Sequence, residues 1–144
     1  MKQAPTWFVT TDVFLTYLTQ PDSPRADDIL HLFEAAEHDK VQLKTSEAVL
    51  GELLDALQSP DAGGKSRDEA ATIVTSILGL EGLRVGGRKR VAEALVLYGQ
   101  TPLSFADCIA AARSRKRGIE GVSSYNRVFD EVPGITRREP GSTV

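Results

Sequence analysis

Three acidic residues, Asp12, Glu52 and Asp107, occupy positions in the sequence from which a carboxylate could serve a catalytic or metal-binding site. The other residues from Phe105 to Ala112 are all apolar, which predicts a central helix with apolar side chains on nearly every face. An ionised carboxylate buried without a partner is costly, so Asp107 should have a cation, several donors or a solvent-filled pocket nearby. The alternative is a plain helix start, since Ser104 and Asp107 have the spacing of a capping pair.

Asp12 and Glu52 each follow a predicted strand. Asp12 lies between the β-type run 7–9 and a helical pattern, where its plainer interpretation is an N-cap. On the helix expected over 46–58, Glu52 falls outside the polar arc and beside two alanines, which predicts that it points inward. The alternative is a boundary residue whose carboxylate reaches solvent.

Short strands alternate with helices along the chain, which predicts an α/β fold: a three-layer sandwich with a short, mainly parallel central sheet flanked by helices. Serines precede several helical patterns as expected N-caps, and Gly118 is the expected end of the Asp107 helix. The runs that favour strands are 7–9, 41–45, 83–85, 121–123 and 135–137, and the helical patterns are 13–18, 24–37, 46–58, a segment from 66, 88–98 and 103–117.

Ligands of parallel sheets bind beyond the carboxyl ends of the strands, where the three acidic residues should meet. Carboxylates that converge repel one another unless a divalent cation neutralises them. The pattern therefore predicts a Mg²⁺ or Mn²⁺ site for phosphoryl chemistry.

Length and composition limit the class of protein. The 144 residues favour one domain over 1–139 with a frayed tail at 140–144, and the net charge of -3 excludes a generally basic nucleic-acid binder while leaving room for a local basic patch. Cys108 is the single cysteine, typical of a reduced compartment, and two histidines offer few zinc ligands. We expect a cytoplasmic protein, because no apolar run approaches membrane-spanning length.

Four blocks of the sequence resemble a known family. They are TTDVFLTYL, SEAVLGELLDAL, LSFADCIAAARSRKRG and VSSYNRVFDEVPGI, in this order. The chain resembles a PIN domain of the VapC type, the toxin ribonucleases of bacterial toxin-antitoxin pairs, from about Phe8 to Arg138. The resemblance implies a metal-dependent endoribonuclease, in which acidic residues from the four blocks hold one or two Mg²⁺ that activate water against an RNA phosphodiester.

The resemblance also assigns positions. Glu52 and Asp107 match the acids of the second and third blocks. In the first block, Thr10 stands where the family has its first Asp, Thr11 matches its Thr, and Asp12 falls on its Asn. In the fourth block, the usual Thr-Phe-Asp is replaced by Ser124, Tyr125 and Asn126.

At two of the family's four acidic positions this chain has a neutral group, the hydroxyl of Thr10 and the amide of Asn126. Neutral oxygens attract a dication less than carboxylates do. The first hypothesis is an active nuclease whose metal ligands and catalytic residues are Asp12, Glu52 and Asp107. Its polar supports are Thr10, Thr11, Ser124 and Asn126. The alternative is a catalytically degenerate PIN-like module that binds RNA or protein. A receiver-like signalling domain is disfavoured, because no adjacent acidic pair follows the first strand.

Basic residues suggest contacts with RNA phosphates. Arg127 is close in sequence to the expected pocket, and further cations lie at the end of the Asp107 helix and at 88–90. The plainer interpretation of such runs is a solvated face or a favourable helix end. The residues of the helix-end cluster are Arg113, Arg115, Lys116 and Arg117.

The resemblance further implies partners. These are a homodimer and a cognate antitoxin whose extended segment reaches the acidic pocket. The helical patterns at 13–18 and 29–33 are apolar enough for a partner surface or for the core.

Overall fold

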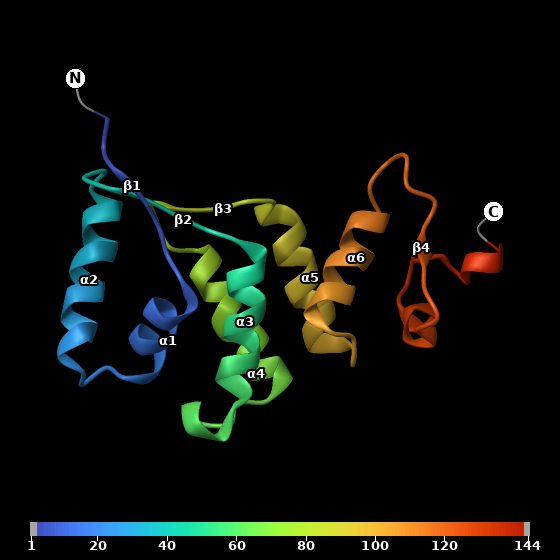
Figure 1. The fold of residues 1–144 in the computed structure, drawn as a ribbon, viewed down its shortest axis with the longest axis horizontal. Helices are drawn as coiled ribbons and strands as arrows, with labels where there is room; N and C mark the ends of the chain where they lie inside the picture. Colours follow the sequence, from blue (N-terminus) through green and yellow to red (C-terminus); the bar gives the residue numbers. More distant parts are fainter. Residues whose placement is uncertain (1–2, 143–144) are drawn as a thin grey trace. The chain divides into compact units, whose positions relative to one another are not determined.

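The computed structural model describes residues 3–142 of the chain (Figure 1). The chain divides into two compact units. The N-terminal unit comprises residues 1–88 and the C-terminal unit residues 89–144. The fold is mixed α/β with a short parallel sheet, as the sequence predicts. The single domain expected over 1–139 stays a prediction.

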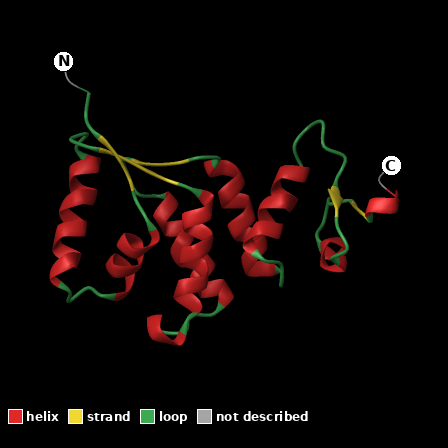
Figure 2. Cartoon of the chain, viewed as in Figure 1, coloured by secondary structure: helices red, strands yellow, loops and turns green. Residues whose placement is uncertain are grey.

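The sheet of the N-terminal unit has three parallel strands in the order β1-β2-β3. Figure 2 draws the strands in yellow. They are β1 (Thr6–Phe8), β2 (Gln42–Thr45) and β3 (Leu83–Val85). Trp7 is paired with Leu43, and Leu43 with Leu83. Leu43, Leu83 and Val85 are buried, so the central strand and β3 supply the apolar face of the sheet.

Four helices complete the N-terminal unit, and serines begin three of them. Ser23, Ser46 and Ser66 accept hydrogen bonds from amides two or three residues ahead, at 3.1–3.2 Å. A serine hydroxyl at this position satisfies one of the unpaired amides of the first turn. The helices are α1 (Thr11–Thr19), α2 (Pro24–Glu37), α3 (Glu47–Gln58) and α4 (Arg67–Leu78), with a 3-10 turn at Pro60–Ala62.

Helix α3 is central to this unit and contributes four buried leucines to its core. It contacts α1 and α4, and α1 in turn contacts α2. The ring of Phe14 on α1 stacks on Phe33 of α2 with centroids 6.2 Å apart, and Tyr17 meets the same ring edge-on at 4.9 Å. Phe14, Ile29 and Phe33 are buried, so these parts of 13–18 and 29–33 belong to the core. Burial of each such side chain contributes about 1.5–3 kcal/mol.

The C-terminal unit contains two helices and a small parallel pair of strands. Helix α5 (Arg88–Gln100) begins at the unit boundary, and α6 (Phe105–Ser114) carries Asp107. Strands β4 (Val122–Ser123) and β5 (Arg137–Arg138) pair in parallel. A 3-10 turn, η2 (Arg127–Glu131), lies between them in sequence, and Phe129 of that turn is buried. Cys108 is buried, as expected of a small core residue.

The end of α6 differs from the prediction. The helix ends at Ser114 with Arg115 as C-cap, not at Gly118. Gly118 does have a left-handed conformation, with φ of +92°, but it lies in the following turn, where Ile119 donates to the carbonyl of Lys116. The predicted left-handed conformation of Gly118 is therefore confirmed, but it lies in the turn that follows α6 and not at the end of the helix.

The last strand and the tail also differ in detail. Strand β5 begins at Arg137, two residues later than expected, and Pro140–Ser142 form a short 3-10 turn. Residues 143–144 of the expected tail lie outside the described residues. None of the helices within residues 3–142 has the length and apolarity that crossing a membrane requires.

Candidate functional site

The first candidate group lies where β1 gives way to α1. The amide of Val9 donates to the carbonyl of Lys44 at 2.8 Å, and the buried hydroxyl of Thr45 donates to the carbonyl of Val9 at 3.0 Å. These bonds tie the carboxyl ends of β1 and β2 together. They hold the corner from which Thr10 starts α1. No sequence pattern predicted this role of Thr45.

Asp12 lies in the first turn of α1, and Thr10 is the N-cap. The plainer interpretation of Asp12 as an N-cap is therefore wrong. The side chain of Thr10 makes no capping bond; its hydroxyl donates instead to the carboxylate of Asp12 at 2.5 Å. This hydrogen bond lowers the pKa of the Asp12 carboxyl below its ordinary value. Asp12 is exposed and ionised at neutral pH, whereas Thr11 beside it is buried.

Glu52 is exposed on α3, so the expectation that it points inward is wrong. Four leucines take the inner side of α3: Leu50, Leu53, Leu54 and Leu57. Glu52 shares the solvent side with Ala48 and Asp55 instead. The two alanines beside Glu52 mark the edge of the buried face and leave the carboxylate open to solvent.

Asp107 forms the second candidate group, in the C-terminal unit. Ser104 is the N-cap of α6, and its hydroxyl accepts the Asp107 amide at 3.1 Å, as the capping alternative predicts. Asp107 is half-buried, and Cys108 and Ile109 next to it are buried. Its carboxylate accepts a hydrogen bond from the side-chain amide of Asn126 at 3.3 Å. The donor that a carboxylate on an apolar helix requires is therefore present, together with partial access to solvent.

Asn126 is oriented by the start of η2. Its side-chain oxygen accepts a hydrogen bond from the backbone amide of Val128 at 3.1 Å, and its own backbone amide donates to the hydroxyl of Ser124 at 3.0 Å. A backbone N–H can only donate, so the oxygen of the Asn126 side chain faces Val128 and the nitrogen faces Asp107. The two predicted polar supports, Ser124 and Asn126, therefore belong to one hydrogen-bonded loop.

Arg137 holds this loop from β5, a role that the sequence patterns did not predict. Its guanidinium donates to both carboxylate oxygens of Asp130, at 3.0 and 3.1 Å, and to the carbonyl of Ser124 at 2.9 Å. The side chain of Arg137 is only 12% exposed. The ion pair lowers the pKa of Asp130 and raises that of Arg137. The sequence signal for this ion pair was the presence of opposite charges, Asp130 and Arg137, on either side of the Pro-Gly turn at 133–134.

The basic residues that the sequence predicted for RNA contacts lie around the end of α6 and on η2. Arg115 donates to the carbonyl of Pro133 at 2.9 Å, so it anchors the turn before β5. Arg113, Lys116 and Arg117 are exposed around the end of α6, and Arg127 is exposed on η2. Arg115 is exposed as well, so all five cations that the sequence predicted for phosphate contacts are open to solvent.

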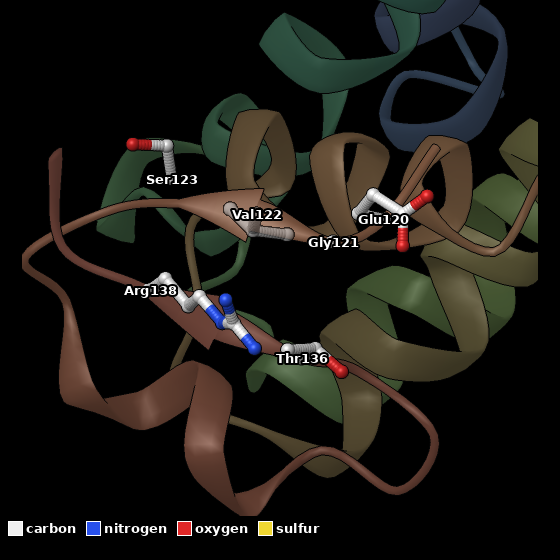
Figure 3. Close-up of a pocket in the computed structure, with 6 residues that line it drawn as sticks. All are labelled: Glu120, Gly121, Val122, Ser123, Thr136 and Arg138. Atoms are coloured by element: carbon white, nitrogen blue, oxygen red, sulfur yellow. The ribbon is translucent and has the colours of Figure 1, made fainter. Parts of the chain in front are cut away.

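A hollow of about 370 Å³ lies beside the β4-β5 pair (Figure 3). Its lining does not include a residue that the sequence predicted for the site. The lining residues are Glu120, Gly121, Val122, Ser123, Thr136 and Arg138. Gly121 is required there, because a Cβ at this position would come within 2.2 Å of the carbonyl oxygen of Thr136.

The three candidate carboxylates have the chemistry of a hard-cation site, but they belong to different units. Asp12 and Glu52 are in the N-terminal unit and Asp107 is in the C-terminal unit. Within residues 3–142, neither unit by itself gathers three acidic, histidine or cysteine side chains in the geometry of a metal site. Each unit does bring a neutral donor to a carboxylate: Thr10 to Asp12, and Asn126 to Asp107.

Comparison with known proteins identifies the family. The model of the PIN domain matches residues 8–135. The chain is 28% identical over 123 residues to a protein described as a VapC ribonuclease from Aquifex aeolicus (strain VF5), covering 85% of this chain and 88% of that protein. No solved structure matches the chain. Since the matched range includes the β1 corner, α3, α6 and the Asn126 loop, the chain belongs to the PIN domain family.

Proposed function

We propose that this protein is a metal-dependent endoribonuclease of the VapC type. Asp12, Glu52 and Asp107 are its ligands for Mg²⁺ or Mn²⁺ and its catalytic residues. The observation that carries the proposal is Asp107, a half-buried carboxylate in the first turn of an apolar helix, within the range matched by the PIN domain. Thr10, Thr11, Ser124 and Asn126 are the polar residues that support these carboxylates.

The chemistry follows from the residues. A bound divalent cation neutralises phosphodiester charge and lowers the pKa of water. Asp12 is ionised at neutral pH and supplies negative charge for the cation. Lys116, Arg117 and Arg127, which are exposed, would bind RNA phosphates, with Arg113 and Arg115 adding positive charge. RNA binding should therefore weaken steeply with salt.

Cleavage of a structured RNA in Mg²⁺ or Mn²⁺ tests the proposal. We expect Asp107→Asn to lower the rate by about 100-fold or more, because changes to the partners of metal ligands alone cost roughly 10–100-fold. Asp68→Asn is the matched control, since Asp68 is an exposed acid in the first turn of α4. Equal cleavage by the native protein and Asp107→Asn would refute the assignment.

The second candidate function is a degenerate PIN-like module that binds RNA or protein without cleaving it. The donors at Thr10 and Asn126 favour it, because both stand where the family has an acid. This function predicts that the native chain leaves RNA intact in Mg²⁺ and Mn²⁺. It also predicts equal RNA affinity with and without EDTA, measured by fluorescence anisotropy, whereas a metal-dependent nuclease should bind more weakly once EDTA is added.

A cognate antitoxin, a homodimer and a cytoplasmic toxin role belong to the same proposal. The similarity to a VapC ribonuclease supports them. Expression that arrests growth, with recovery when a neighbouring small gene is co-expressed, is the expected result for a toxin. Light scattering on the purified chain would show a mass of two chains if the homodimer forms.

A further inference from the structure

Tyr125 is the most exposed large hydrophobic side chain within residues 3–142, with 72% of its surface open to solvent. It lies in the loop between β4 and η2, directly before Asn126. A single exposed apolar residue is common and by itself indicates nothing. What distinguishes Tyr125 is the loop that carries it, because hydrogen bonds hold that loop on both sides of the ring.

The two neighbours of Tyr125 fix the backbone around it. The carbonyl of Ser124 accepts the guanidinium of Arg137 at 2.9 Å, and the hydroxyl of Ser124 accepts the backbone amide of Asn126 at 3.0 Å. The side chain of Asn126 donates to Asp107 at 3.3 Å. A tyrosine presented from a loop held in this way loses little conformational entropy when its ring meets a flat partner, since its side chain has only two torsions.

A cation follows this ring closely in the chain. Arg127 is exposed and begins η2 two residues after Tyr125. Asp130, an acid of the same turn, has both carboxylate oxygens bound by Arg137, so the charge of Arg127 stays available to an anion from solvent. The backbone of Asn126 between them is extended, with φ of -79° and ψ of 105°, which sets the α-carbons of residues 125 and 127 about 6–7 Å apart. One nucleotide can span that separation.

A flat ring beside a guanidinium suits an unpaired nucleotide. A base stacks on an aromatic ring once it has left its own stack, as in single strands and in the loops of folded RNA. The phosphate of the same nucleotide carries the negative charge that a neighbouring arginine binds. A protein partner would favour an apolar surface around the ring, whereas the adjoining residues Ser124, Asn126 and Arg127 are polar.

We propose that Tyr125 and Arg127 form a binding site for one unpaired RNA nucleotide, whose base stacks on the Tyr125 ring and whose phosphate binds the Arg127 guanidinium. The inference rests on the proposed function, because it takes RNA as the ligand, and it adds that the bound RNA is single-stranded at this point. The site lies wholly in the C-terminal unit, and its contacts require no metal.

Fluorescence anisotropy with a labelled single-stranded RNA tests the stacking contact, in EDTA so that no RNA is cut. We expect Tyr125→Ala to weaken binding roughly 5–100-fold, the loss that removal of one stacked aromatic ring causes. Tyr125→Leu should weaken binding nearly as much, because leucine is apolar but not flat. Tyr125→Phe is the matched control and should bind like the native protein. A blunt RNA duplex should bind the native protein and Tyr125→Ala equally.

The salt dependence of the same binding tests Arg127. Arg127→Ala should reduce the slope of log affinity against log salt concentration by about 0.7, since one phosphate contact on a single strand is lost. Arg84→Ala, which removes an exposed arginine from β3, should leave the slope unchanged. Circular dichroism on each variant shows that the fold is retained.

Equal affinity of the native protein and Tyr125→Ala for the single strand would overturn the inference and assign the exposed ring to a protein contact. An equal loss on the duplex would overturn it as well, because no unpaired base would then be involved. Failure of the proposed function is distinguishable, since RNA cleavage in Mg²⁺ or Mn²⁺ would be absent while the effect of Tyr125→Ala on binding in EDTA remained.

Discussion

The regions around Asp12 and Asp107 are alike in chemistry and different in construction. Each carboxylate lies in the first turn of a helix and accepts a hydrogen bond from a neutral side chain. Asp12 takes its donor from Thr10, two residues away, whereas Asp107 takes its donor from Asn126, 19 residues away. The first contact forms wherever α1 begins at Thr11. The second requires that a distant loop be held in place.

Two other side chains of the C-terminal unit hold this loop in place. Phe129 of η2 is buried, and Arg137 joins Asp130 to the carbonyl of Ser124. The Asp107 region therefore depends on packing and on an ion pair, and the Asp12 region depends on a helix start. Substitutions in one region should therefore change its carboxylate without changing the carboxylate of the other region.

The largest expected effect comes from Phe129→Ala. Removal of this buried ring should destabilise the protein by about 3–5 kcal/mol, because a cavity remains and the turn loses its anchor. Urea unfolding gives the loss of stability, and the side-chain NH₂ signal of Asn126 should move toward its value in a free peptide. Phe14→Ala, in the N-terminal unit, is the matched control. A retained Asn126 signal in Phe129→Ala would contradict the dependence on packing.

Arg137→Ala should have the next largest effect. Loss of the guanidinium contacts with Asp130 and Ser124 frees the loop that carries Asn126, so we expect RNA cleavage to fall by roughly tenfold. The pairing of Thr10 with Asp12 should be unaffected, as judged by the pKa of Asp12 in a carboxylate NMR titration. Arg138→Ala, an exposed neighbour, should behave like the native protein. Recovery in Arg137→Lys would argue for charge alone, since lysine cannot make the bidentate contact.

The two helix starts give a smaller and sharper contrast. Ser104→Ala should cost about 1 kcal/mol of unfolding free energy, because its hydroxyl accepts the Asp107 amide. Thr10→Val should cost much less, since the Thr10 side chain makes no capping bond. Thermal unfolding of both variants decides the matter, and equal losses would mean that Thr10 also acts as a cap.

The smallest effect is on the pH dependence of stability. Arg137 lowers the pKa of Asp130, so the stabilisation from this pair is fully present above the unfolded pKa of about 3.9 and is lost as pH falls through the lower folded value. The difference in stability between the native protein and Asp130→Asn should therefore be constant above about pH 5 and shrink below about pH 4. A difference that grew on acidification would assign the effect to another group.

Local residue patterns were enough to predict most elements of the chain. Ser23, Ser46, Ser66 and Ser104 each begin a helix where the sequence indicates it, because a capping hydroxyl and the amide it accepts are only two or three residues apart. The order of short strands and helices was sufficient for an α/β fold with a parallel sheet. The bond between Thr10 and Asp12 is of the same local kind.

Tertiary structure alone decided which distant groups meet. The exposure of Glu52 depended on how four leucines of α3 turned inward, and the end of α6 depended on the turn that follows it. The contact of Asn126 with Asp107, and the fork of Arg137 that supports it, join residues that no helical or strand period relates. Local hydrogen bonds are determined by chain geometry over a few residues, whereas these contacts arise only when folding closes the loops between them.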